Sequence, residues 1–323
     1  MQENEFSPKR IPIEGFDRVK RLLGPLINFA GTLAGPEYRI SSESLVVQEV
    51  STQCSVSYRH KFVFATDLHI GTPGQMDSAG IDVVFDRINH ELSDPYSQNG
   101  LLFGGDFVNK PLYPVDDATS FRVFPQLLER IHQIVMQGIP VVAIAGNHDI
   151  ENPDWESYYL PNLEAIGVKM LDNFEACYVG EIPIVGVPDY SQEEVRMNFE
   201  ERVEQAREFL DCFLTNNLPA MYLSHNPDAA DILDRLLKVT DIVPTGHSHR
   251  SGYPMDSGLF AGLVGRLALK TSPVNDHQSS RDGYRQLPSG AMLYNPAGVG
   301  NHSIHGKRRV PHELLNLVFL PNQ

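Results

Sequence analysis

Short apolar runs alternate with longer amphipathic stretches from about residue 58 to the end of the chain. Runs of about four to eight β-branched or aromatic residues predict strands, and apolar residues that recur every three to four positions predict helices. Strands are predicted at residues 61–66, 101–106, 141–146, 220–225, 241–247 and 313–320. Helices are predicted at about 78–92, at 120–137 and at 191–214, where Ser191 and Glu194 form a capping-box signature. This alternation is typical of an α/β fold.

Residues that can bind metal ions follow the carboxyl ends of five predicted strands. In chain order they occur in the motifs DLH (67–69), GGD (104–106) and GNHD (146–149), at the single His225, and in GHSH (246–249). The carboxyl ends of strands in an α/β sheet form one edge, where loops can converge on a ligand. One such motif arises by chance in many chains, but the ordered series in this strand context is specific. We therefore expect the five motifs to meet at one site.

The side chains of these motifs are carboxylates, an amide and imidazoles, and no thiolate is among them. Such ligands suit Mn²⁺, Fe or Zn²⁺. A carboxylate can bridge two metal ions, because each of its oxygens has free lone pairs. Two adjacent divalent ions generate a hydroxide nucleophile at neutral pH and bind phosphate oxygens. The sequence therefore predicts a hydrolytic site for phosphate esters that holds two divalent ions, with Mn²⁺ as the first expectation.

The composition is that of an ordinary globular chain, since 41% of the 323 residues are hydrophobic and 21% are charged. The chain has 41 acidic and 26 basic residues, which give a net charge of −15. A surface this acidic argues against nucleic acid as the main partner. Cys54, Cys177 and Cys212 show no short spacing, which favours reduced thiols over a disulfide framework or a zinc ribbon.

The N-terminal region is the part of the sequence that suggests a membrane. Its apolar run at residues 22–35 is shorter than the roughly 20 residues that a spanning helix needs, and acidic residues before it disfavour a secretory signal. A helix on a membrane surface fits better, with Phe16, Val19, Leu23 and Leu26 on one face. The alternative is an arm that packs on the domain or is loosely ordered. We predict an arm at 1–57 with this helix and a first strand, a domain at 58–323, and a long loop at 252–289 beside the site.

The ordered motifs resemble those of the calcineurin-like metallophosphoesterase superfamily, over about residues 61–320. The resemblance implies a four-layered α/β/β/α sandwich with a site for two metals at the carboxyl-terminal edge of the strands. It also implies that Asp106 bridges the two metals and that His148 stabilises the transition state or protonates the leaving oxygen. Asp149 would hold the His148 ring in place, or would cap the N-terminus of a helix. The implied ligands are Asp67, His69 and His249 for one metal, and Asn147, His225 and His247 for the other.

Some positions differ from the motifs of particular branches of the superfamily, and these differences indicate which branch the chain resembles. Asn109 stands where purple acid phosphatases have a tyrosine, which excludes that branch, and the net charge argues against the nucleases that share these ligands. The segment before DLH and the glycine-rich tail from residue 294 are similar to the YkuE/YaeI-like branch. The apolar and basic N-terminal arm fits the UDP-2,3-diacylglucosamine pyrophosphatase (LpxG-like) subgroup of proteins similar to that branch. Arg250 replaces a glycine usual in that branch, so it is a candidate to bind a second phosphate, with a plain surface arginine as the alternative. His302 is a second candidate substrate contact.

The function predicted first is a two-metal hydrolase for a lipid-linked phosphodiester or pyrophosphate. UDP-2,3-diacylglucosamine, cleaved to UMP and lipid phosphate in lipid A synthesis, is the substrate that the resemblance implies. The protein would then be cytoplasmic and peripheral at the inner membrane, with the N-terminal arm on the membrane surface. One alternative is a soluble phosphodiesterase for nucleotides or cell-envelope polymers. Another is an inactive scaffold, although scaffolds of this fold typically lose ligands that this chain keeps.

Overall fold

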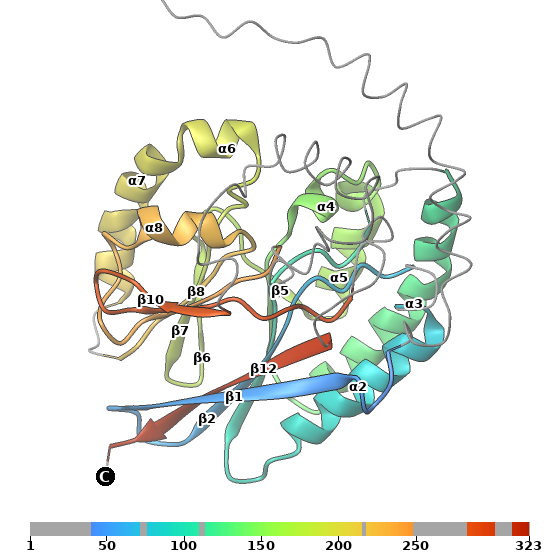
Figure 1. The fold of residues 1–323 in the computed structure, drawn as a ribbon, viewed down its shortest axis with the longest axis horizontal. Helices are drawn as coiled ribbons and strands as arrows, with labels where there is room; N and C mark the ends of the chain where they lie inside the picture. The colour runs from blue at the N-terminus through green and yellow to red at the C-terminus, as the bar shows by residue number, and fades with distance from the viewer. Residues whose placement is uncertain are drawn as a thin grey trace, which may run out of the picture.

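Two six-stranded sheets form the centre of the computed structural model, which describes residues 40–71, 76–109, 114–214, 218–247, 283–300 and 312–322 (Figure 1). The first sheet has the order β1 (Leu45–Cys54), β12 (His312–Pro321), β2 (His60–Ala65), β3 (Gln98–Phe103), β4 (Val141–Ala143) and β5 (Lys169–Met170). The second has the order β10 (Tyr284–Gln286), β11 (Met292–Tyr294), β9 (Ile242–Pro244), β8 (Met221–Leu223), β7 (Ile182–Gly186) and β6 (Ala176–Val179).

Helices cover the outer face of each sheet, and they lie on opposite sides of the molecule in Figure 1. Those beside the first sheet are α2 (Ser78–Leu92), α3 (Pro114–Met136), α5 (Leu160–Ala165) and the π-helical turn at Trp155–Tyr159. Those beside the second are α6 (Glu193–Met197), α7 (Phe199–Phe213), α8 (Ala230–Leu233) and the 3-10 turn at Pro227–Ala229. The short helix α4 (Asn147–Ile150) follows β4.

The alternation of side chains along β2 shows why two sheets and two layers of helices stack in four layers. Every residue of β2 is buried, and successive side chains of a strand point to opposite faces. Val63 and Ala65 pack with α2 and α3, whereas Phe62 and Phe64 pack against Ile184 and Leu223 of the second sheet. A third apolar cluster joins the second sheet to α7 and α8. The predicted α/β/β/α sandwich is therefore confirmed.

Parallel pairing brings the carboxyl ends of the central strands to one edge of each sheet. Strands β2, β3, β4 and β5 pair in parallel, and so do β7, β8, β9 and β11. Strand β12 pairs in parallel with β1 and antiparallel with β2, so the last and the first strands complete the first sheet. Among the described residues, no helix has both the length and the apolar character needed to cross a membrane.

Most predicted elements are found close to their predicted places. The helix predicted at 78–92 is α2, and the predicted strands overlap β2, β3, β4, β8, β9 and β12. The helix predicted at 191–214 is instead two helices, α6 and α7, that meet at Asn198. The capping box was wrong, because Gln192 is the N-cap of α6 and the Ser191 hydroxyl donates to Asp189. Part of the loop predicted at 252–289 is the strand β10, and residues 1–39 lie outside the described part of the chain.

Candidate metal centre

The predicted motifs come directly after β2, β3, β4, β8 and β9, and backbone hydrogen bonds join their loops. The N–H of Asp67 donates to the carbonyl of Gly105 at 3.0 Å, and the N–H of His69 donates to that of Asp106 at 2.9 Å. On the other sheet, the N–H of Gly246 donates to the carbonyl of His225 at 2.9 Å. The DLH loop is thereby fixed to the GGD loop, and the GHSH turn to the His225 loop.

Asp106 lies between two groups of possible metal ligands. One group consists of His69, Asp106 and His148, and the other of Asp106, His225 and His247; within each, the ligand atoms lie within 4.8 Å of one another. Oδ2 of Asp106 is 3.6 Å from Nε2 of His69 and 3.3 Å from Nε2 of His225. A carboxylate shared by two such groups occupies the position that a bridging ligand needs.

Backbone contacts orient the imidazole of His225. Its Nδ1 is 2.8 Å from the carbonyl oxygen of Gly104, so Nδ1 is the nitrogen that carries the proton and donates. Its Nε2 then faces Asp106 and the Asn147 Oδ1 atom, which is 3.1 Å away. Nδ1 of His247 lies 2.8 Å from the same Asn147 oxygen. A histidine whose second nitrogen donates to a backbone carbonyl is typical of metal sites, because this bond fixes the tautomer that leaves a lone pair for the metal.

Asp67 is buried between the GHSH turn and a loop from the C-terminal part of the chain. Its two carboxylate oxygens are 2.9 and 3.2 Å from the N–H of His247. A Cβ atom at Gly246 would lie 2.7 Å from Asp67 Oδ2, and one at Gly298 would lie 2.9 Å from it. The carboxylate is therefore enclosed by two glycines that leave no room for a side chain.

The backbone is left-handed at four of the predicted ligands. The φ angles are 55° at Asp67, 47° at His69, 56° at Asp106 and 63° at His247. Side chains other than glycine disfavour this region, so each such residue costs about 1–3 kcal/mol and persists only where the surroundings enforce it. The hydrogen bonds between the loops supply that enforcement. Strain of this kind concentrates at functional sites.

The charges at the site favour bound cations. Burial raises the pKa of Asp106, and Asp67 adds to the rise while His225 opposes it. Burial lowers the pKa of His225, but Asp106, Asp67 and Asp189 outweigh that effect and hold it well above the usual value. Buried carboxylates this close together are costly unless cations neutralise them. With imidazole, amide and carboxylate donors, the site fits divalent metal ions of the Mn²⁺, Fe or Zn²⁺ type.

His148 and Asp149 complete the GNHD motif in different ways. His148 is half-buried, and its ring packs edge-on against that of His69 with 4.8 Å between the centroids. Asp149 accepts hydrogen bonds from the N–H groups of Val108 at 3.0 Å and Gly146 at 2.9 Å. Neither of these bonds involves the His148 ring, and the role of Asp149 in holding that ring stays a prediction. Asp149 stands in the first turn of α4 and binds the backbone N–H of Gly146, which is the N-cap. Burial, followed by the Asp106 charge, raises its pKa to about 7.

Comparison with known families agrees with this geometry. The sequence profile of the calcineurin-like phosphoesterase family matches residues 60–251. The chain belongs to this family. The protein is therefore a metal-dependent phosphoester hydrolase. No curated protein matches the chain in a sequence comparison.

The structure places near the centre of this phosphoesterase two further residues that no sequence motif indicated. Asp189, which follows β7, is 3% exposed and acts electrostatically on both Asp106 and His225. The amide of Asn152 donates to the carbonyl of Asn109 at 3.0 Å and so holds the loop after Asp106. Asp189 follows a strand, as the predicted ligands do, but β7 was not among the predicted strands. The role of Asn152 has no sequence signal that we recognise.

Three predicted site residues lie outside the described part of the chain. These are the ligand His249 and the substrate contacts Arg250 and His302. Their roles remain predictions.

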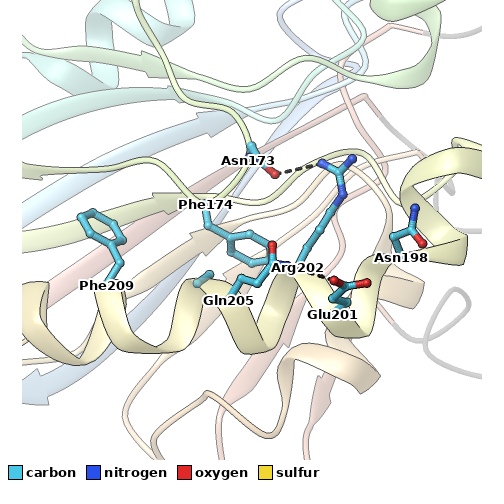
Figure 2. A pocket seen from close by; sticks show the side chains of 8 residues that line it. Asn173, Phe174, Asn198, Glu201, Arg202, Gln205 and Phe209 are labelled. Atoms are coloured by element: carbon cyan, nitrogen blue, oxygen red, sulfur yellow. Dashed lines mark hydrogen bonds between the residues drawn. The ribbon is translucent and has the colours of Figure 1, made fainter.

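A hollow of about 570 Å³ lies between α7 and the turn before β6 of this phosphoesterase (Figure 2). Arg202 donates across it to Asn173 at 2.9 Å. The hollow is lined by Asn173, Phe174, Asn198, Glu201, Arg202, Gln205, Ala206 and Phe209. None of these is a predicted site residue, so the hollow and the predicted metal ligands do not coincide. We place the reaction at the two ligand groups around Asp106.

Proposed function

We propose that the chain is a two-metal phosphodiesterase or pyrophosphatase whose centre is built around Asp106. The observation that carries the proposal is that Asp106 belongs to both groups of possible ligands. Asp67, His69 and His249 would hold one metal, and Asn147, His225 and His247 the other. Bound divalent ions supply a hydroxide nucleophile and neutralise the phosphate. Mn²⁺ is the first expectation, and Zn²⁺ or Fe are the alternatives.

The protein's own groups supply orientation and a proton. The bond from His225 Nδ1 to the Gly104 carbonyl keeps this ring in the tautomer that can ligate through Nε2. His148 lies beside His69 and is half-buried, and its ring would protonate the leaving oxygen. Asp149 fixes the turn that presents Asn147 and His148, because it binds the backbone of Gly146 and Val108.

For the substrate we propose a lipid-linked pyrophosphate or phosphodiester, with UDP-2,3-diacylglucosamine as the specific candidate. The similarity of the tail to the YkuE/YaeI-like branch supports this choice, as does the apolar and basic segment at residues 16–35. The protein would act in the cytoplasm at the inner-membrane surface, with an arm at 1–57 and a catalytic domain at 58–323. Arg250 and His302 would contact the substrate. A soluble phosphodiesterase for nucleotides or cell-envelope polymers is the second candidate, and the net charge of −15 disfavours a nucleic-acid substrate.

The deciding experiment compares turnover of UDP-2,3-diacylglucosamine and bis-p-nitrophenyl phosphate after chelation and re-addition of Mn²⁺. Strong preference for the lipid substrate supports the lipid-linked proposal. Turnover of the small diester alone assigns the protein to the soluble alternative. No turnover of either, with metal still bound, would favour the scaffold.

Vesicle flotation tests the membrane part separately. The full-length protein should float with anionic vesicles, and a variant without residues 1–35 should not. If the full-length protein stays free of vesicles, the lipid proposal loses its support from the arm while the metal chemistry stands.

A further inference from the structure

The loop at residues 295–300 contacts the backbone of the DLH motif and lies beyond the residues that the family profile matches. The N–H of Val299 donates to the carbonyl of Thr66 at 2.9 Å, and the N–H of Gly300 donates to that of Asp67 at 2.7 Å. Gly298 faces the Asp67 side chain so closely that a Cβ there would lie 2.9 Å from both Asp67 Cβ and Oδ2. Asp67, whose φ is 55°, is thus held on one side by this loop and on the other by the N–H of His247.

Glu313, on β12, forms two hydrogen bonds with this loop. It is 1% exposed, and its Oε2 accepts a hydrogen bond from the N–H of Ala297 at 2.7 Å. Its own N–H donates to the carbonyl of Gly298 at 3.0 Å. The backbone of Glu313 is fixed in turn, because it pairs with Val46 of β1 in the first sheet. The two hydrogen bonds therefore fix the Ala297 N–H and the Gly298 carbonyl, which flank the peptide bond between these two residues.

We propose that Glu313 is a positioning residue for the metal carboxylate Asp67, on which it acts through the Ala297–Gly298 peptide. The inference rests on the proposed function, because it takes Asp67 to be a metal ligand. Burying a carboxylate costs free energy unless it forms hydrogen bonds. An apolar residue at position 313 could pack in the same sheet without this cost, but it would not bind the loop through its side chain. Outer groups that orient a metal ligand typically change metal affinity about 10- to 100-fold when they are removed. Glu313 should act on metal affinity in the same way.

Calorimetric titration of the metal-stripped full-length protein with Mn²⁺ measures this effect without turnover. Glu313→Ala should weaken Mn²⁺ binding at one of the two sites by about 10- to 100-fold. Glu313→Gln should stay within a few-fold of the wild type, because its amide oxygen can still accept from the N–H of Ala297. Wild-type affinity in Glu313→Ala would overturn the proposal.

A matched control separates positioning from general stability. Glu91 is a second carboxylate bonded to β12, with a side chain that is 11% exposed; it accepts a hydrogen bond from the amide of Asn316 at 2.7 Å and pairs with Lys61 and Arg87, none of which belongs to the 295–300 loop. Glu91→Gln should lower the unfolding temperature of the metal-free protein and leave both Mn²⁺ affinities unchanged. An equal loss of affinity in Glu91→Gln would show that Glu313 acts only through stability.

Asp67→Ala distinguishes failure of this inference from failure of the proposed function. If Asp67→Ala still binds two ions at wild-type affinity, the proposed ligand set is wrong. If Asp67→Ala loses an ion while Glu313→Ala does not, only the positioning role is wrong. Should Glu313→Ala fail to fold, Gly298→Ala disturbs the contact between the loop and Asp67 directly. Wild-type affinity in that variant would show that the loop does not position Asp67, and would also reject the proposal.

Discussion

The backbone N–H of His148 donates a hydrogen bond of 2.8 Å to Oδ1 of Asp106. Because Oδ2 of Asp106 faces His69 and His225, this one carboxylate connects the GNHD turn to both ligand groups. The residue proposed to donate a proton is thus placed by the same side chain that would bridge the metals. The first two predictions below separate these two residues.

Asp106→Ala should lose metal and turnover together, and Asn147→Ala should do the same. Asp106 belongs to both ligand groups, and the Asn147 oxygen lies within 3.1 Å of His225 and 2.8 Å of His247. Elemental analysis after dialysis gives the ions bound per chain, and a phosphodiesterase assay gives the turnover. Either variant retaining two ions and normal turnover would contradict its assignment as a ligand.

His148→Ala should keep its metal but lose about 100- to 10,000-fold in turnover, the usual contribution of a general acid. The ring lies close enough to His69 and Asp106 to be a ligand, so the metal content is informative. The measurement is kcat beside metal content at saturating Mn²⁺. Loss of an ion would make His148 a ligand, and normal turnover would remove it from the chemistry altogether.

Gly298→Ala should weaken metal binding and activity, because its Cβ would lie 2.9 Å from the Asp67 carboxylate. Gly138→Ala is the matched control, since the φ angles are 76° and 78° and a Cβ at Gly138 meets nothing within 4 Å. The left-handed backbone costs each variant about 1–2 kcal/mol of stability. Urea unfolding should show both losses, while metal titration should show a change only for Gly298→Ala. Equal metal affinity in the two variants would mean that the contact with Asp67 does not matter.

Glu91→Gln should lower the free energy of unfolding at neutral pH. It should also remove part of the dependence of that free energy on pH. Burial raises the pKa of Glu91, but hydrogen bonds from Lys61 and Asn316 outweigh it and hold the pKa below the usual 4.5. The unfolded chain therefore takes up this proton first, so the stabilisation is complete above about pH 4.5 and is lost as the pH falls through the lowered folded value. We expect a difference of about 2 kcal/mol at pH 7 in the free energy of unfolding, from the loss of bonds to a charged group. Urea titrations from pH 7 to pH 3 should show the two proteins converging; a constant difference would contradict the linkage.

Much of the fold was predictable because its signals are local. The run KFVFAT is apolar on both faces, which is what a strand buried between two layers requires, and β2 is found there. The periodic helix at 78–92 is found as α2. The strands β5, β10 and β11 were not predicted; they have two or three residues each and owe their extended form to neighbouring strands. The break between α6 and α7 at Asn198 is likewise absent from the sequence pattern.

The sequence by itself determined the chemical types of the centre and their order along the chain, because a metal site needs specific side chains and strands end at recognisable places. The tertiary structure decided how these groups meet. It alone places Asp106 in both ligand groups, gives Asp67 and His247 their left-handed backbones, and brings the N–H of Val108 to Asp149. It also brings Glu313 and the 295–300 loop to Asp67. The physical reason is that these contacts join residues far apart in the chain, and only the packing of two sheets brings them within hydrogen-bond distance.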